Sequence, residues 1–394
     1  MDRESVKDVL REEKKRRRSK SRARTMQLFA MLACLVVLVV LMYGGLTIYT
    51  LFRQDSVETM QGDVSGLGLD DDGNVVNTDE GEDVIGVISD AVVYSQEELD
   101  ERIAEAVSMA QETASMEILD ALRLGLSGGS TVVETLRPFY PDDIVVASGG
   151  RYHFVPINYD LAQSDLLTEN LNFLESGEAQ YLVDGQVISH KGIDVSKFQG
   201  TIDWNLVAQD GVEFAFIRVA NRGWGSNGTL MEDDYFDANM AGAQAAGIKT
   251  GVYIYSQAIT EEELLEEANL VLSKIAPYDV QCPVVFDVER VSDANGRMNK
   301  ITVEERTHLT LLFCQTRENA GYHPMIYHTT EMGALLLDVA ALEGYDKWFA
   351  AYTDTLYYPY EYKVWQYSQT GRVQGIAKDV DLNISFEPLW EASE

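Results

Sequence analysis

The sequence has little cysteine, histidine or positive charge. Among 394 residues there are 3 Cys and 5 His, and 31 Lys or Arg stand against 64 Asp or Glu, which gives a net charge of −33. This excess of negative charge disfavours nucleic-acid binding by the main body of the chain, because contacts to phosphates need cations. The sequence also lacks a HEXXH zinc pattern, a glycine-rich phosphate loop after a strand and a serine elbow. Metal-dependent hydrolysis, nucleotide chemistry and acyl transfer are therefore disfavoured.

The few cysteines leave one question open. Cys34 lies in a long apolar run, and Cys282 and Cys314 lie far beyond it. Outside the cytoplasm the latter two either pair or stay reduced, and their spacing does not decide between these states. We expect no cofactor and no metal site.

Positive charge is concentrated at the N-terminus. Residues 1–25 hold eleven Lys or Arg, and the 28-residue run "TMQLFAMLACLVVLVVLMYGGLTIYTLF" that begins at Thr25 has no charge. Such a run is long enough to span a bilayer, which takes about 20 residues, and it is longer than the apolar part of a cleaved signal peptide. We predict a basic cytoplasmic tail over 1–25, an uncleaved transmembrane helix over 26–52, and an extracellular location for the rest of the chain.

The next two segments differ sharply in composition. Residues 53–94 are acidic, contain glycine and are predicted to form a flexible spacer. Residues 95–126 are predicted to form a helical stalk, because Ser95 and Glu98 make a capping-box pattern ahead of a stripe of Leu, Ile and Ala at spacings of three and four. The stripe fits either self-association of the stalk or packing on the following module, and both remain open.

Residues 131–190 are predicted to form a small β-rich module. The runs "DIVVASGGRYHFVPI" and "YLVDGQVIS" each place a glycine-containing turn between two strand-like stretches. A segment of this size is only marginally stable alone, so we expect it to pack on its neighbour. Its role is either that of a spacer or that of a ligand-binding element.

From residue 191 to residue 390 strand-like and helix-like runs alternate. Eight strand-like runs begin near residues 192, 214, 250, 283, 324, 348, 362 and 380, and helices are expected near 204–209, 233–246, 261–275, 303–320 and 331–342. This alternation predicts an α/β fold in which a parallel sheet closes into a barrel. The last links are too short for full helices, so we predict an irregular TIM-like (β/α) barrel with incomplete last βα units.

Acids and aromatic residues gather at the expected ends of these strands. Functional groups of such barrels collect at the carboxyl ends of the strands. The predicted catalytic residues are the four acids Asp194, Asp287, Glu289 and Asp381, and the predicted substrate contacts are Tyr255, Tyr327, Tyr352, Trp365 and Asn383. Carboxylates beside aromatic rings are what glycoside hydrolysis requires, with one acid protonated and another charged. Repulsion between Asp287 and Glu289 would raise the pKa of one of them, which would keep Glu289 protonated.

Seven sequence motifs resemble those of a known enzyme family. "KGIDVSKFQGTIDW", "FAFIRVANRG", "GVYIYS", "PVVFDVE", "KWFAAY", "YKVWQYS" and "VDLNISF" occur in this order over residues 191–388 and resemble glycoside hydrolase family 25, the Chalaropsis-type lysozymes or muramidases. The resemblance implies cleavage of the β-1,4 bond between N-acetylmuramic acid and N-acetylglucosamine in peptidoglycan, with Glu289 as the proton donor. Its companion acids would be Asp287, Asp194 and Asp381.

Two alternatives remain beside this expectation. Asp287 would act either as a nucleophile or as the residue that orients the substrate's own 2-acetamido group for attack. The competing function is that of a wall-binding or scaffold protein that holds glycan without cutting it. The expected partners are therefore peptidoglycan strands and, through the N-terminal helix, a membrane.

Overall fold

The computed structural model describes residues 67–69, 75–77, 96–293 and 295–390. The predicted cytoplasmic tail (1–25) and transmembrane helix (26–52) lie outside these ranges. Among the described helices, none combines the length and the apolar character that crossing a membrane requires.

The chain divides into two units, up to Ala104 and from Glu105 onward. In the first unit β1 (Leu67–Leu69) pairs with β2 (Val75–Asn77) in antiparallel register. The segment predicted to be a flexible spacer therefore contains one short antiparallel pair within its described residues.

The predicted stalk is the helix α2 (Gln96–Ser127), and Gly129, at a φ of 89°, follows its end. All side chains from Asp100 to Asp120 are exposed, including Ile103 and Ile118 of the apolar stripe. Within the second unit, the stripe from Ala106 to Ile118 therefore does not pack on the β-rich module, and that alternative is wrong for these residues.

The β-rich module contains the two predicted hairpins. Its elements are α3 (Val132–Leu136), η1 (Arg137–Phe139), β3 (Asp143–Ser148), β4 (Arg151–Pro156), η2 (Thr168–Asn170), β5 (Leu171–Phe173), β6 (Ala179–Val183) and β7 (Gln186–Val187). β3 pairs with β4, and β6 pairs with β5 and β7, all in antiparallel register. Gly149 and Gly150 connect β3 to β4 at φ values of 57° and 74°, which glycine adopts without strain.

Eight strands form the barrel. They are β8 (His190–Val195), β9 (Phe214–Arg222), β11 (Lys249–Ser256), β12 (Val284–Val288), β13 (Pro324–Thr329), β14 (Asp346–Ala350), β15 (Val364–Gly371) and β16 (Val380–Ser385). They pair in this order, and the pairings of β8 with both β16 and β9 close the barrel. The short strand β10 (Leu230–Glu232) pairs with the outer edge of β9.

The predicted all-parallel sheet is wrong for the last strand. The pairs from β8 to β15 are parallel, but β16 runs antiparallel to both of its neighbours, β15 and β8. Only residues 372–379 connect β15 to β16, and a parallel crossover needs a dozen or more residues. The start of β16, not its end, therefore lies at the mouth, by which we mean the end of the barrel where the parallel strands terminate.

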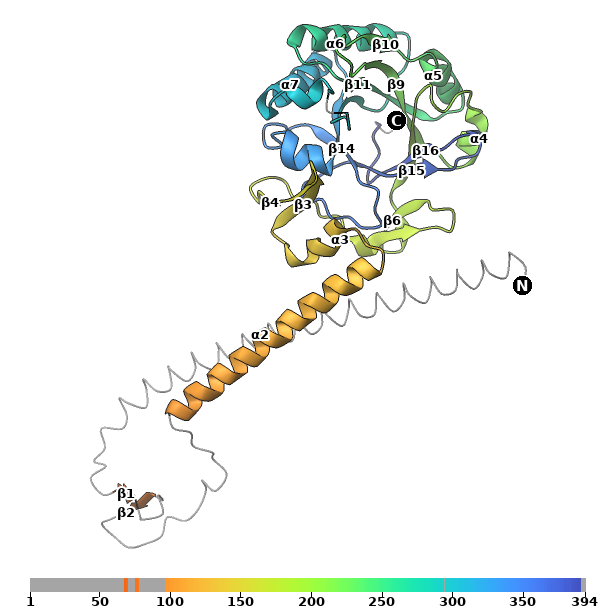
Figure 1. The fold of residues 1–394 in the computed structure, drawn as a ribbon. Coiled ribbons are helices and arrows are strands. Elements are labelled where there is room, and N and C mark those ends of the chain that lie inside the picture. The colour runs from red at the N-terminus through yellow and green to blue at the C-terminus, as the bar shows by residue number, and fades with distance from the viewer. Residues whose placement is uncertain (1–66, 70–74, 78–95, 294, 391–394) are drawn as a thin grey trace, which may run out of the picture. The chain divides into compact units, whose positions relative to one another are not determined.

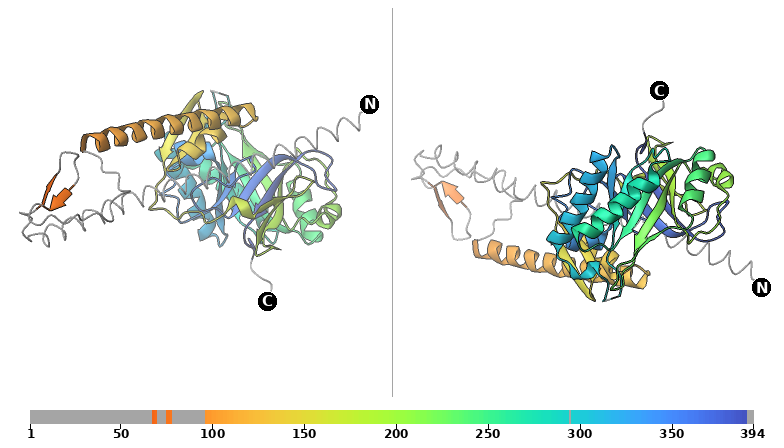
Figure 2. Two further views of the ribbon diagram at one scale, coloured as in Figure 1. Left: turned by 90° about the horizontal axis from the view of Figure 1, so that it is seen from below. Right: turned by 90° about the horizontal axis from the view of Figure 1, so that it is seen from above.

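Helices cover only part of the barrel wall. Figure 1 shows α4 (Trp204–Gln209), α5 (Phe236–Ala245), α6 (Glu261–Ile275) and α7 (Val303–Asn319) around one side of the barrel, and the β-rich module on the other. Both views of Figure 2 keep the module against the barrel. The helix predicted over 331–342 is reduced to a short π-helical turn, η4 (Met332–Leu336). Another short turn, η3 (Met298–Lys300), precedes α7.

The β-rich module takes the place of the missing helices. The link from β14 to β15, residues 351–363, contains no helix. Instead, the ring of Phe173 packs edge-on against Trp365 and Tyr367, at centroid distances of 6.4 and 6.1 Å. Ile144 and Tyr181 of the module are buried in the same apolar cluster as the outer faces of the barrel strands. The module thus shares a core with the barrel and is not a detached spacer.

The barrel interior holds a separate apolar cluster, in which Phe216 stacks on Trp348 at 4.6 Å. Cys282 belongs to this inner cluster and Cys314 to the outer one. Both cysteines are buried and free, so the open question of a disulfide is answered in favour of reduced thiols.

Candidate active site

Asp194 and Asp381 face each other across the seam that closes the barrel. They are directly paired residues of the antiparallel strands β8 and β16, and Asp194 is buried. Asp194 accepts two amide hydrogen bonds at Oδ2, one from Gln366 Nε2 at 2.8 Å and one from Asn383 Nδ2 at 2.9 Å. Burial raises the pKa of Asp194, and these donors lower it.

Asp381 holds a proton in this arrangement. Burial, the charge of Asp194 and a hydrogen bond to that carboxyl raise the pKa of Asp381 to about 8. A pKa of about 8 favours the protonated form of Asp381 at neutral pH, and that form donates a hydrogen bond to Asp194.

Asp287 and Glu289 lie on the opposite wall. Asp287 is on β12, paired between Tyr255 of β11 and Tyr327 of β13, and Glu289 follows the end of the strand. Burial is the first cause that raises the pKa of Asp287 far above its usual range, and the charge of Glu289 is the second. Burial also raises the pKa of Glu289, against a hydrogen bond from Tyr327 that lowers it. Desolvation thus outweighs the repulsion that the sequence suggested, and it acts on both carboxyls.

Asp287 has an unused acceptor. Its Oδ1 atom is buried and has no hydrogen-bond partner among the described residues. A buried carboxyl oxygen without a donor costs free energy, so this atom is available to a donor that a ligand brings.

Tyr327 and Tyr352 converge on one amide. The Tyr352 hydroxyl donates to Gln366 Oε1 at 2.9 Å, the Tyr327 hydroxyl lies 3.0 Å from the same oxygen, and the Gln366 amide nitrogen donates to Asp194. Tyr352 is 51% exposed, so its ring remains available to a ligand. Tyr255 is partly buried, and burial and the charges of Asp287 and Glu289 raise its pKa above its usual range. The structure therefore brings three predicted tyrosines to the acids.

Two residues that were predicted to contact the substrate, Trp365 and Asn383, are buried instead. Trp365 is 1% exposed, packs in the outer cluster and donates its indole N–H to the Ala351 carbonyl at 3.0 Å. Side chains alternate along a strand, so Gln366, and not Trp365, faces the acids. Asn383 is fully buried and uses Oδ1 to accept from Trp348 at 2.8 Å and Nδ2 to donate to Asp194. The prediction of direct substrate contact is wrong for both side chains.

Sequence reasoning missed Arg218, the cation of the site. It lies inside the apolar strand β9, is bound to Asp233 through Nε at 2.9 Å, and its charge lowers the pKa of both Asp194 and Asp287. The sequence feature that could have revealed Arg218 is an arginine within the apolar run "FAFIRVA", because a buried charge needs a partner. Gln366 was missed in the same way, as a polar residue within "VWQYS".

Two exposed rings at the mouth were missed as well. Phe198 is 63% exposed and follows the carboxyl end of β8, and the Arg218 guanidinium lies 5.0 Å from its ring centroid. Trp224 is 46% exposed and follows the end of β9. Large exposed rings just after barrel strands are the available signal for such positions.

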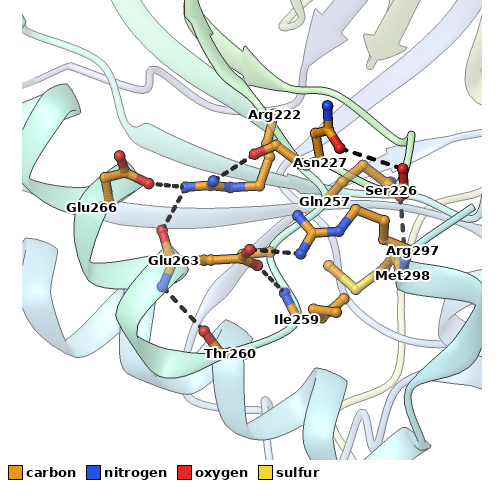
Figure 3. A network of polar contacts seen from close by, with 12 residues as sticks. Arg222, Ser226, Asn227, Gln257, Ile259, Thr260, Glu263, Glu266, Arg297 and Met298 are labelled. Atoms are coloured by element: carbon orange, nitrogen blue, oxygen red, sulfur yellow. Dashed lines mark hydrogen bonds and ion pairs between the residues drawn. The ribbon is translucent and has the colours of Figure 1, made fainter.

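A buried ionic network holds the loop after β9 (Figure 3). In the figure Arg222 lies beside Glu266, and its Nη2 donates to Glu266 Oε2 at 2.8 Å. Arg222 Nη1 also donates to the Gly228 carbonyl at 2.7 Å, and its Nε donates to the buried Glu267 at 2.6 Å. Arg297 contacts Glu263 at 2.5 Å and lies so close to Gly228, which has a φ of 52°, that a Cβ there would meet the guanidinium at 1.5 Å. The network therefore fixes the position of the loop that carries Trp224.

The arrangement can perform proton transfer and stabilise positive charge. It combines carboxyls of raised pKa, one buried cation and exposed aromatic rings in a single mouth. Within the described residues no group of three or more His, Cys, Asp or Glu side chains is placed to hold a metal ion.

Comparison with known proteins finds a similar family for most of the barrel. The family described as glycosyl hydrolases family 25 matches residues 193–376. Residues 193–376 are therefore similar to this family over most of the barrel. The family match ends before Asp381 and Asn383, and it begins after the β-rich module.

Individual proteins are similar to about half of this chain. Lysozyme M1 of Streptomyces globisporus is 29% identical over 205 residues, which cover 49% of this chain and 66% of that protein. An autolytic lysozyme of Clostridium acetobutylicum is 27% identical over 194 residues, covering 49% of this chain and 55% of that protein. A family 25 glycosyl hydrolase structure from Bacillus anthracis is 24% identical, with a TM-score of 0.43, covering 53% of this chain and 93% of that one. The match thus spans less than two thirds of either lysozyme.

Proposed function

We propose that the protein is a peptidoglycan hydrolase, an N-acetylmuramidase that cleaves the β-1,4 bond between N-acetylmuramic acid and N-acetylglucosamine. The observation that carries the proposal is the convergence of Asp194, Asp287, Glu289 and Asp381 on one barrel mouth within or beside a family 25 domain. Two of the similar proteins bear the name lysozyme, which supports the same substrate class.

In this proposal Glu289 is the general acid. Its raised pKa favours the protonated form that must donate to the leaving glycosidic oxygen. Asp194 and Asp381 share one proton and anchor the wall opposite Glu289, while Tyr255 and Tyr352 contact the sugars. Trp365 and Asn383 are buried and do not contact the sugars, and Asn383 instead donates a hydrogen bond to Asp194.

For Asp287 we propose assistance to the substrate's own acetamido group. Its buried Oδ1 lacks a donor, and the N–H of a 2-acetamido group would supply one while the acetamido oxygen attacks the anomeric carbon. Direct nucleophilic attack by Asp287 is the competing mechanism, and it requires an ionised carboxyl in a place where burial favours the neutral form.

The competing function is binding of wall glycan without cleavage. Incubating the soluble part, from about Thr131 onward, with purified peptidoglycan separates the two functions. New N-acetylmuramic acid reducing ends would support the hydrolase, and sedimentation with the wall without release of fragments would support the binding protein. Chitin in the same assay tests a third possibility, an enzyme for another acetylated glycan.

We further propose that the protein is anchored in the plasma membrane by residues 26–52, with residues 1–25 in the cytoplasm and the barrel outside. The charge-free run and the basic residues before it support this topology. Protease treatment of intact cells tests it, because the barrel should be digested while the N-terminal tail is protected.

For the stalk helix α2 we propose self-association. Ile103 and Ile118 expose an apolar stripe along α2, which supports self-association of the stalk. Sedimentation of the full-length chain in detergent tests this, and a monomer at all concentrations would reject it.

A further inference from the structure

The segment that carries Glu289 has left the sheet. β12 ends at Val288, so the next three residues are outside the strand pairing of the barrel. Side chains from elsewhere hold this segment instead of a backbone ladder. The position of Glu289 therefore depends on those side chains.

Two of these side chains come from the barrel itself. Gln257, fully buried after β11, donates from Nε2 to the Glu289 carbonyl at 3.1 Å and accepts from the Met298 N–H at 3.3 Å. Asn299 accepts from the Val291 N–H at 3.2 Å and donates to the Val291 carbonyl at 2.8 Å. They fix the backbone on either side of Arg290.

The third contact comes from the β-rich module. Arg290 Nη1 donates to Glu331 Oε1 at 2.7 Å and to Ser148 Oγ at 3.0 Å, and Ser148 Oγ donates to the same Glu331 oxygen at 2.5 Å. We call these three residues the Arg290 clamp. Ser148 lies outside the residues matched by the family, whereas Arg290 and Glu331 lie within them.

The β-rich module fixes the position of Ser148, its residue in the Arg290 clamp. Ser148 is the last residue of β3, directly before the turn of Gly149 and Gly150. The module is docked beside the clamp, because the Arg137 guanidinium lies 3.1 Å from the ring centroid of Tyr357 and Thr168 Oγ1 exchanges hydrogen bonds with the backbone of Leu356. The Ser148 hydroxyl is thus presented by a structure that shares its core with the barrel.

We propose that Ser148 is a positioning residue of the active site, which with Glu331 holds Arg290 so that the adjoining Glu289 faces Tyr327 and the bond to be cut. The β-rich module is then a part of the enzyme that this chain adds to the family 25 barrel. The proposal rests on the proposed function, in which Glu289 is the proton donor.

Loss of the Ser148 hydroxyl should change catalysis more than binding or folding. Arg290 would keep one partner of two, and a small displacement of Glu289 is enough to lower kcat by about ten-fold. KM should stay within about two-fold, because the exposed rings of the mouth are untouched. Glu289 would become more hydrated, its pKa would fall towards its ordinary value, and the basic limb of the pH profile would move to lower pH.

The test uses the full-length chain, purified in detergent because of the apolar run. Ser148→Ala removes the hydroxyl, Ser148→Thr keeps one, and Glu331→Gln removes the charge of the second partner. Ser176→Ala is the matched control in the same module, since among the described residues the Ser176 hydroxyl has one hydrogen-bond partner, the Glu178 N–H at 3.4 Å. Each variant is assayed for release of reducing ends from peptidoglycan across pH and for hydrogen exchange of residues 289–293.

The proposal predicts faster exchange of 289–293, a lower kcat and a shifted basic limb in Ser148→Ala and Glu331→Gln, with recovery in Ser148→Thr and no change in Ser176→Ala. It is overturned if Ser148→Ala leaves exchange of this segment and the pH profile unchanged, or if activity falls only in proportion to thermal stability. Should the unaltered protein release no reducing ends, the proposed function fails on its own, and the exchange data still decide whether the clamp exists.

Discussion

Asp194 and Asp381 form a carboxyl–carboxyl pair across the two strands that close the barrel. The amides of Gln366 and Asn383 donate to Asp194 at 2.8 and 2.9 Å, which favours its charged form, and burial and the charge of Asp194 raise the pKa of Asp381 to about 8. The strand pair of β8 and β16 thus closes the barrel and also places two hydrogen-bonded carboxyls at its mouth.

This pair should make stability depend on pH. The pKa of Asp381 is raised from an unfolded value of about 3.9, so its stabilising protonation is complete below that value and is lost as pH rises through about 8. The free energy of unfolding should therefore fall between about pH 4 and pH 8, and the fall should be smaller in Asp381→Asn. Urea unfolding at a series of pH values measures it.

Asp379→Asn is the matched control for that experiment. Asp379 is half-exposed and pairs with Arg372 at 2.6 Å on the surface. Its substitution should leave the pH dependence unchanged. An Asp381→Asn protein with the same slope as the unaltered protein would show that Asp381 is not the proton carrier.

Tyr327 should tune the proton donor. Its hydrogen bond lowers the pKa of Glu289, so Tyr327→Phe should raise that pKa and move the basic limb of the pH–activity profile to higher pH. Tyr352→Phe is the control, because the Tyr352 hydroxyl donates to Gln366 at 2.9 Å and has no such effect on Glu289. Equal shifts in the two variants would contradict the assignment.

The acetamido group should be essential if Asp287 assists the substrate. Peptidoglycan whose N-acetylmuramic acid residues have been N-deacetylated lacks the attacking oxygen, so we expect a loss of turnover of about a hundred-fold or more. Measuring release of reducing ends from treated and untreated wall gives the ratio. Similar rates on both substrates would instead favour direct attack by Asp287.

The Arg222 network should contribute strongly to stability. Arg222→Leu leaves the fully buried Glu267 without its cation, and breaking a buried pair costs about 3–5 kcal/mol. Lys274→Met is the surface control, since Lys274 pairs with the exposed Asp237 at 2.9 Å and exposed pairs contribute about 1 kcal/mol or less. Chemical denaturation of both variants checks the difference, and equal losses would contradict it.

Sequence periodicity predicted most barrel elements, because alternation of strands and helices reflects burial on both faces of a parallel sheet. The direction of β16 was not predictable in this way. A strand has the same pattern in either direction, and the shortness of residues 372–379 signalled only a missing helix.

The four acids could be placed at one mouth from the sequence, but their protonation could not. Spacing suggested repulsion between Asp287 and Glu289, whereas burial sets both pKa shifts first. Trp365 was misplaced because its burial depends on Phe173, which comes from a module distant in sequence. Ser148 escaped notice for the same reason, since no local pattern links it to Arg290.

Whether the protein is a muramidase with Glu289 as its proton donor is tested by the rate at which N-acetylmuramic acid reducing ends appear from purified peptidoglycan, compared between the unaltered protein and Glu289→Gln. We predict release by the unaltered protein and a loss of about a thousand-fold or more in Glu289→Gln, because an amide cannot donate the proton to the leaving oxygen. Release at an unchanged rate by Glu289→Gln, or binding of the wall without any release by the unaltered protein, would contradict the account.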